Sequence, residues 1–260
     1  MVRFVTSYRI PILCTAAILA ALIVPGSASA AGYDFPLSGY WPMNEGRGQV
    51  VRDWSGNGNN GQLGSTAGVD ANDPSWIRGL YGWSYGLHFA GNQFVSIPDS
   101  NDLEPQQLTL SAWFRGSGSP GEFKYLVAKG SNECRTGSYG LYTGQYGGLA
   151  FYVSDASAST FTVSAPASQA VWDGKWHNAS GTFDGQTVRL FIDGKEIGTG
   201  TPRGGAPIGY DTPAGNTTVG TYGGTCDLSF TGDLDEVSIW KKPLPIAEIW
   251  KKAAILLQPH

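Results

Sequence analysis

Short apolar stretches with period-two alternation recur along most of the chain, and turn-forming dipeptides separate them. Asp193-Gly194, for example, joins two such stretches with the spacing of a two-residue β-hairpin. Because no helical pattern intervenes between the stretches, the sequence predicts two antiparallel sheets packed face to face, an all-β sandwich with a jelly-roll path. The predicted strands are Gly39–Met43, Asn60–Leu63, Tyr85–Phe89, Phe94–Ile97, Leu108–Arg115, Tyr125–Lys129, Tyr139–Thr143, Leu149–Val153, Phe161–Ser164, His177–Phe183, Val188–Ile192, Lys195–Gly198, Thr217–Thr221 and Gly232–Trp240.

Only the C-terminal end departs from this pattern. Between Pro245 and Leu257, Ile246, Ile249 and Trp250 recur at helical spacing, and proline is acceptable in a first helical turn. The segment therefore predicts a short amphipathic helix that packs on the domain. A contact with a partner through this helix stays open.

The first 30 residues have the pattern of a secretory signal peptide. Arg3 and Arg9 precede the apolar run Ile10–Val24, and Ala28-Ser29-Ala30 resembles a cleavage site. The run is too short to cross a bilayer, and no later segment is apolar enough to do so. We expect residues 1–30 to be removed and residues 31–260 to form one secreted domain.

The charge balance argues against two classes of partner. Without Arg3 and Arg9, 15 of the 17 basic residues remain against 21 acidic ones, a formal net charge of −6. The basic residues form no cluster, so nucleic acid and anionic membranes are not expected as ligands.

Two cysteines follow the leader, Cys134 and Cys226, each in a polar or glycine-rich segment. In an oxidising compartment the simplest interpretation is a disulfide between them, although the sequence alone leaves their bonding open. Closing a loop of this size would stabilise the fold by about 4 kcal/mol on the chain-entropy model. No histidine lies near either cysteine in sequence, so a catalytic thiol is not expected.

The segment Asp53–Gly61 combines oxygen-bearing side chains with three glycines. A hard cation such as Ca²⁺ needs six to eight oxygen ligands, and a tightly curled loop can supply them. The loop is not an EF-hand, because the position that should hold the bidentate glutamate is Gly64. The alternative is a polar turn, since Asn57-Gly58 and Asn60-Gly61 are hairpin signals by themselves.

The chain contains, in this order, the fragments Tyr40–Gly46, Asp53–Gly61, Gly86–Phe89, Val95–Pro98, Leu110–Trp113, Asp173–His177, Phe191–Gly194 and Gly232–Val237. Together these fragments resemble bacterial laminin G-like domains of the concanavalin A-like lectin and glucanase superfamily. The resemblance covers nearly the whole chain after the leader, and it implies a two-sheet jelly roll, commonly with one structural Ca²⁺, in a secreted protein that binds carbohydrate or another extracellular ligand.

The resemblance also implies a set of metal ligands. In such domains the early Gly-Asn loop meets the final long strand, so Asp53, Asn57 and Asn59 would be joined by Asp235 or Glu236. Strand alternation predicts that only one of these two acidic side chains turns fully into the site. Alternatively, both cap the strand and accept hydrogen bonds from loop amides.

The superfamily contains glucanases, whose catalytic strand reads Glu-x-Asp-x-Glu or Glu-x-Asp-x-x-Glu. The segment Asp233–Glu236 begins with Asp and places its Glu directly after the second Asp, which is the wrong spacing for a retaining pair. We therefore expect a binding module and not an enzyme, with a glycoside hydrolase as the less favoured hypothesis.

Aromatic residues in loops are candidates for sugar contacts, because a sugar ring presents apolar C–H faces. An adhesion or structural module with a protein ligand is the alternative function. Trp41, Trp113, Trp176 and Trp240 are expected in the core. The candidate ligand-binding residues are Tyr146, Trp172, Tyr210 and Tyr222.

Overall fold

The computed structural model describes residues 37–134, 137–155, 160–223 and 226–254. These residues belong to one compact unit, Phe35–His260. The predicted leader, residues 1–30, lies outside the described residues, as do the last residues of the predicted C-terminal helix.

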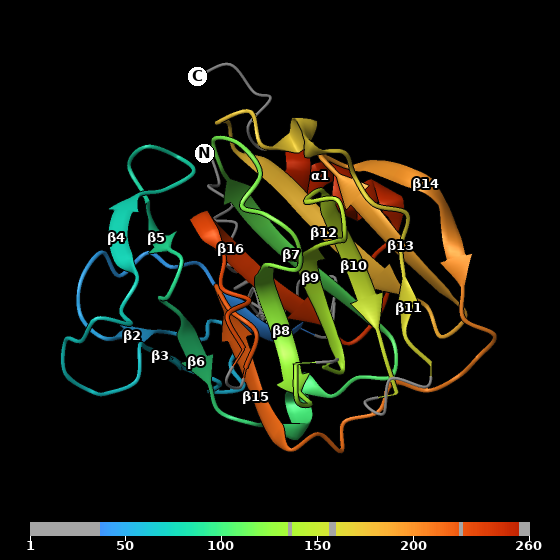
Figure 1. Cartoon of the computed structure of the whole chain (residues 1–260), viewed down its shortest axis with the longest axis horizontal. Helices are drawn as coiled ribbons and strands as arrows, with labels where there is room; N and C mark the ends of the chain where they lie inside the picture. The colour runs from blue at the N-terminus through green and yellow to red at the C-terminus, as the bar shows by residue number, and fades with distance from the viewer. Residues whose placement is uncertain (1–36, 135–136, 156–159, 224–225, 255–260) are drawn as a thin grey trace, which may run out of the picture. The chain divides into compact units, whose positions relative to one another are not determined.

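The described strands form two antiparallel sheets, as the sequence predicts (Figure 1). Sheet A runs in the order β14-β13-β12-β7-β16-β5-β4, with β1 also paired to β16, and sheet B runs β11-β10-β9-β8-β15-β6-β3-β2. The strands of sheet A are β1 (Leu37–Trp41), β4 (Ser75–Arg78), β5 (Tyr85–Ala90), β7 (Leu108–Arg115), β12 (His177–Phe183), β13 (Thr187–Ile192), β14 (Lys195–Pro202) and β16 (Thr231–Trp240). Those of sheet B are β2 (Val50–Val51), β3 (Gly61–Leu63), β6 (Val95–Ile97), β8 (Tyr125–Ser131), β9 (Tyr139–Thr143), β10 (Leu149–Val153), β11 (Thr162–Val163) and β15 (Ala214–Val219).

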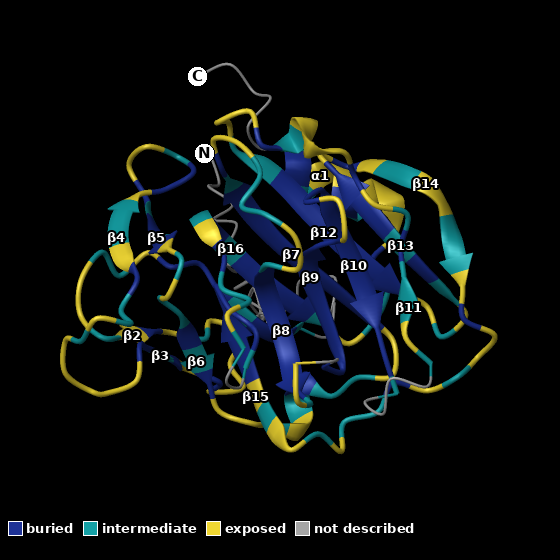
Figure 2. Cartoon of the chain, viewed as in Figure 1, coloured by how far each residue is buried: buried dark blue, intermediate teal, exposed yellow. Residues whose placement is uncertain are grey.

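The main hydrophobic core lies between the sheets. Phe151 of β10 meets the backbone of β12, where a Cβ on Gly181 would lie 2.1 Å from the Phe151 ring. Leu110 of β7 and Trp41 of β1 are fully buried in the same core. Figure 2 shows the central strands β8, β9 and β10 buried along their length, whereas the edge strands β4 and β14 are partly exposed.

A second apolar layer covers the outer face of sheet B. It is built from tyrosines that alternate with core residues along the strands, and we call it the tyrosine cluster: Tyr125, Ala128, Tyr142, Ala150, Tyr152 and Tyr222. Burial raises the pKa of the Tyr142 hydroxyl to about 12. This layer explains why β9 and β10 are buried on both faces.

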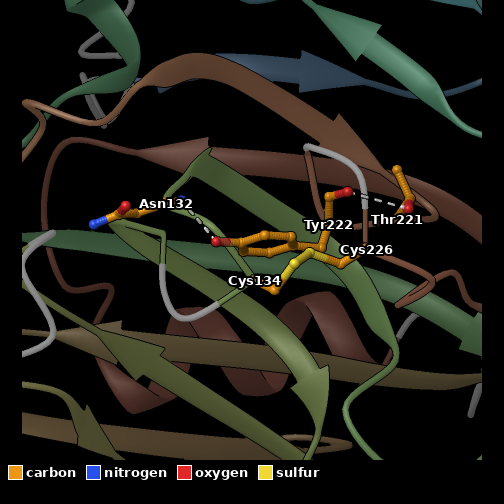
Figure 3. Close-up of a disulfide and its surroundings, with 5 residues drawn as sticks. All are labelled: Asn132, Cys134, Thr221, Tyr222 and Cys226. Atoms are coloured by element: carbon orange, nitrogen blue, oxygen red, sulfur yellow. Dashed lines mark hydrogen bonds between the residues drawn. A yellow bond between two sulfur atoms is a disulfide. The ribbon is translucent and has the colours of Figure 1, made fainter.

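A disulfide joins Cys134 to Cys226 beside this cluster, which confirms the pairing expected from the sequence. The two Cα atoms lie 5.7 Å apart and 92 positions separate the residues in the chain. Figure 3 shows the Tyr222 ring next to the bridge, with its hydroxyl accepting a hydrogen bond from the Asn132 backbone N–H at 2.7 Å. The bridge thus fastens the segment around Tyr222 over the outer face of sheet B.

The helix α1 (Ile246–Ala254) packs on the outer face of sheet A through Ile249, which contacts Phe191 and Leu244. None of the helices in the described residues is long and apolar enough to span a membrane. Of the tryptophans expected in the core, Trp41 and Trp113 are buried. Trp176 and Trp240 are only half-buried, because each lies at the outer surface beneath a basic side chain, Arg115 and Lys252 respectively.

Candidate functional site

The turn between β9 and β10 carries the most exposed of the predicted ligand residues. A hydrogen bond from Gly147 N to Gly144 O, 3.0 Å long, closes the turn, and Gly147 has a φ of 65°, in the left-handed region. A side chain there would also lie 2.4 Å from Ser119 Oγ. The glycine therefore lets the chain reverse tightly, and Tyr146 projects into solvent with 74% of its surface exposed.

Tyr146 stands at a pocket of about 530 Å³ on the outer face of sheet B. The floor includes Tyr142 of β9 and Val163 of β11, and the rim carries the amides of Gln145 and Gln169. Gln169 Nε2 donates a 2.6 Å hydrogen bond to the Tyr146 carbonyl, which ties the turn to the opposite rim. The pocket combines an exposed aromatic ring with hydrogen-bonding amides.

Trp172 lies in the core and not at the surface. It is 4% exposed, and its ring packs against Phe114 and Phe230 with centroid distances of 4.9 and 6.0 Å. Its Nε1 donates a hydrogen bond to Gly147 O at 2.9 Å. Trp172 thus supports the Tyr146 turn from below, and its ring faces are not available to a ligand.

The side chains of Tyr210 and Tyr222 also pack against other protein side chains and not at an open surface. Tyr210 packs on the core, 6.3 Å from the Tyr139 ring, and its hydroxyl donates to the Pro105 carbonyl at 2.5 Å. Tyr222 is 1% exposed within the tyrosine cluster. Of the four aromatic candidates, the structure leaves only Tyr146 with an exposed ring.

The Asp53 loop is organised by hydrogen bonds to its carboxylate. Asp53 Oδ1 accepts from the backbone N–H groups of Tyr40 and Ser55 at 3.0 and 2.8 Å, and Oδ2 accepts from Asn59 N at 2.9 Å. The Asn57 and Asn59 side chains donate through Nδ2 to the Ser38 carbonyl. The loop is therefore anchored to β1, with three amide donors directed at the aspartate.

The predicted strand alternation is wrong at Asp235 and Glu236. Leu234 and Val237 are both fully buried in the core, although three positions separate them. A register shift between Asp235 and Ser238, with a φ of 53° at Glu236, accommodates the extra residue as a β-bulge. Both acidic side chains therefore lie between two inward-facing residues, and neither is directed into the core.

These two carboxylates are largely shielded from water. Asp235 is 1% exposed, and burial raises the pKa of its carboxyl to about 8 even though Leu80 N and Glu236 N donate hydrogen bonds to it. Glu236 Oε2 accepts a 2.5 Å hydrogen bond from the Tyr40 hydroxyl. Tyr40 thus contacts both halves of the predicted metal site, Asp53 through its backbone and Glu236 through its side chain.

The donor set permits a hard cation only with help from neutral oxygens. Among the described residues, no group of three or more His, Cys, Asp or Glu side chains is placed to hold a metal ion. The buried Asp235 carboxylate and the half-buried Glu236 carboxylate nevertheless fit Ca²⁺, which accepts backbone carbonyl and amide oxygens as further ligands. The Asp53 carboxylate already accepts three N–H groups, which is the arrangement of a polar turn.

Sequence reasoning missed a further polar cluster on the outer face of sheet A. Asp233 of β16 lies between His88 of β5 and Arg115 of β7, with Asp233 Oδ1 2.7 Å from His88 Nδ1 and Oδ2 2.7 Å from Arg115 Nε. The three residues are far apart in the sequence and become neighbours only because β5, β16 and β7 are adjacent in the sheet.

Solved structures with the same fold share little sequence with this chain. Domain 4 of AbnA, an extracellular arabinanase from Geobacillus stearothermophilus, in complex with arabinotriose, aligns with a TM-score of 0.62 and 16% identity, over 84% of this chain and 98% of that one. The binding domain of botulinum neurotoxin DC in complex with rat synaptotagmin II aligns with a TM-score of 0.59 and 12% identity, over 85% of this chain and 51% of that one. A Trypanosoma rangeli sialidase aligns with a TM-score of 0.57 and 15% identity, over 83% of this chain and 32% of that one.

The chain thus spans about half of the toxin domain and a third of the sialidase. A comparison with curated protein sequences found no match. A laminin G family model, described as concanavalin A-like lectin/glucanases superfamily, matches residues 89–250. This match extends over more than half of the sequence and includes the β9–β10 turn and the β16 bulge, and the chain belongs to the concanavalin A-like lectin/glucanases superfamily.

Proposed function

We propose that this domain is an extracellular binding module for carbohydrate, and that the ligand binds in the pocket beside Tyr146. The observation that carries the proposal is the exposed Tyr146 ring, held at the rim of a 530 Å³ pocket by the Gln169 and Trp172 hydrogen bonds. A rigid aromatic face next to amide groups suits the apolar face and the hydroxyls of a sugar ring.

Two further features support an extracellular role. The N-terminal pattern of residues 1–30 is that of a secretory signal, and a disulfide joins Cys134 to Cys226. Among proteins with this fold, the arabinanase domain was solved with arabinotriose and the neurotoxin domain with synaptotagmin, so the fold accommodates both a sugar and a protein ligand. The exposed tyrosine over a pocket favours the sugar here.

Replacing Tyr146 with Ala tests the proposal. Loss of a central aromatic contact typically costs about 2 kcal/mol of binding free energy, so the affinity for a glycan should fall by roughly 30-fold. Because Tyr146 is 74% exposed, the melting temperature should stay close to that of the wild type. Isothermal titration calorimetry against a panel of arabinan, galactan, xylan and glucan oligosaccharides measures the affinity.

Trp83→Ala is the matched control, because Trp83 is 73% exposed and does not line the pocket. Its affinity for the glycan should equal that of the wild type. Binding that survives Tyr146→Ala but is lost in Trp83→Ala would place the ligand elsewhere. A wild-type protein that binds no glycan in the panel would contradict the carbohydrate function and favour a protein ligand.

We also propose that the domain binds one structural Ca²⁺, with Asp235 and Glu236 as its charged ligands. A buried carboxylate beside a half-buried one is costly unless a cation or a hydrogen-bond network compensates them, and Asp235 is 1% exposed. Asp53, with Asn57 and Asn59, would shape the adjoining loop and add amide or carbonyl oxygens.

Thermal unfolding with Ca²⁺ and with chelator tests the metal proposal. A ligand at 100 times its dissociation constant stabilises the folded state by about 2.7 kcal/mol, so chelation should lower the melting temperature of the wild type. Asp235→Asn should abolish this Ca²⁺-dependent difference. Asp53→Ala should lower stability both with and without Ca²⁺, because three amide donors lose their acceptor. A wild-type melting temperature that is the same with Ca²⁺ and with chelator would contradict the proposal.

A further inference from the structure

A second pocket, of about 470 Å³, opens where β5, β7 and β16 meet the β7–β8 loop. His88, Arg115 and Asp233 line it from the strands, and Ser117 and Ser119 line it from the loop. In contrast to the Tyr146 pocket, its walls carry charged side chains.

The two pockets lie on either side of the contact between the β7–β8 loop and the β9–β10 turn. Ser119 Oγ donates a 2.7 Å hydrogen bond to Gly147 O, which joins the β7–β8 loop to the β9–β10 turn. Gly118 N donates to Trp172 O at 2.8 Å, and this bond fixes the same loop to the segment beneath the turn. Figure 1 shows the β7–β8 loop and the β9–β10 turn at the same upper end of the sheets. The Tyr146 pocket opens on the outer face of sheet B and the second pocket on the outer face of sheet A, so a glycan that occupies both would cross this contact at the end of the sandwich.

In the second pocket, His88 and Arg115 share one acceptor, the Asp233 carboxylate. Both oxygens of Asp233 are engaged, Oδ1 with His88 and Oδ2 with Arg115. A guanidinium has five N–H groups, and in the described part of the chain those on Nη1 of Arg115 find no acceptor. One carboxylate thus faces two basic side chains. The Nη1 N–H groups of Arg115 remain to donate to an acceptor on a ligand.

Arg115 is also held in a fixed position. Its guanidinium carbon lies 4.8 Å from the centre of the Trp176 ring, and its side chain keeps 35% of its surface exposed. Because a planar guanidinium binds oxyanions bidentately, a fixed and partly exposed arginine is suited to a carboxylate or a sulfate.

We propose that the second pocket binds the anionic group of an acidic sugar, a uronate carboxylate or a sulfate ester, and that the ligand of this domain is an acidic glycan that occupies both pockets. This inference rests on the proposed carbohydrate function of the Tyr146 pocket. The chain carries a formal net charge of −4, so general electrostatic attraction does not favour an acidic ligand. Selectivity for the acidic sugar then depends on Arg115.

Calorimetric titration with matched oligosaccharides tests the proposal. The probes are oligogalacturonates, sulfated galactan oligosaccharides and neutral galactan oligosaccharides of equal length. The wild type should bind one of the acidic series at least tenfold more tightly than the neutral series, and which one it prefers distinguishes carboxylate from sulfate. Arg115→Met should reduce this acidic affinity about tenfold and leave the neutral affinity unchanged.

Arg189→Met is the matched control, because Arg189 has the same 35% side-chain exposure and also pairs with a carboxylate, that of Glu196, away from both pockets. It should bind all probes as the wild type does. Arg115→Lys keeps the charge and provides a second test if the Met variant does not fold. It should lose part of the preference for the acidic series, with an unchanged melting temperature.

Equal wild-type affinity for acidic and neutral series would overturn the inference, as would an Arg115→Met variant that keeps the acidic preference. In both cases a loss of neutral binding in Tyr146→Ala would still support the carbohydrate function. If the wild type bound none of the three series, the inference would fail, and binding to the neutral arabinan, galactan, xylan and glucan panel would decide the carbohydrate function separately.

Discussion

Trp172→Ala is expected to destabilise the domain by about 3–5 kcal/mol, because it removes a large side chain from a packed core. Trp172 is 4% exposed, it packs against Phe114 and Phe230, and a Cβ on Gly116 would lie only 2.9 Å from its ring. Its indole N–H also supports the Gly147 carbonyl. Chemical denaturation of the variant and the wild type measures the loss.

Trp172→Phe separates packing from hydrogen bonding, since it keeps an aromatic ring and removes the N–H. It should cost less than Trp172→Ala, but it leaves Gly147 O without this donor and should loosen the Tyr146 turn. If Trp172→Ala instead unfolded at the wild-type denaturant concentration and lost only glycan binding, Trp172 would be a direct ligand contact and the core assignment would be wrong.

Removing the disulfide is the second change with a large expected effect. In the double variant Cys134→Ala with Cys226→Ala, the unfolded chain regains the freedom of a loop of 92 residues, which costs about 4 kcal/mol of stability on the chain-entropy model. For a domain of this size the melting temperature should fall by roughly 10 °C. Differential scanning calorimetry measures the shift.

The wild type in reducing buffer should melt at the same temperature as the double variant, which controls for local effects of the substitutions. Because the bridge fastens the segment around Tyr222, the tyrosine cluster should become accessible first, and near-ultraviolet circular dichroism reports on it. Equal melting temperatures for oxidised and reduced protein would show that the bridge contributes nothing to stability.

The sequence predicts the strands well because the two faces of each strand differ. In β7, β9, β10 and β12 the expected and observed bounds coincide, and in the Asp193-Gly194 hairpin both residues have the positive φ that the turn requires. The two strands that were missed lack this signal. β2 has only two residues, and β4, Ser75–Arg78, is an edge strand without a buried alternate face.

The site was less predictable, since a loop aromatic looks the same in sequence whether its ring is covered or exposed. Tyr146 and Trp172 both lie near glycines, but only the fold shows that Trp172 fills the space beneath the Tyr146 turn. The cluster of His88, Arg115 and Asp233 depends on strand neighbours that no local pattern specifies. The bulge at Glu236 likewise arises from register and not from residue type.

The most direct test of the account is a nuclear magnetic resonance titration of the wild-type domain with the glycan that binds best. We expect the largest backbone amide shifts in the β9–β10 turn around Tyr146 and in the opposite rim around Gln169, with no comparable shifts in the β4–β5 loop that carries Trp83. Shifts confined to the Asp53 loop or to the β4–β5 loop, with the Tyr146 turn unchanged, would contradict the assignment of the carbohydrate site.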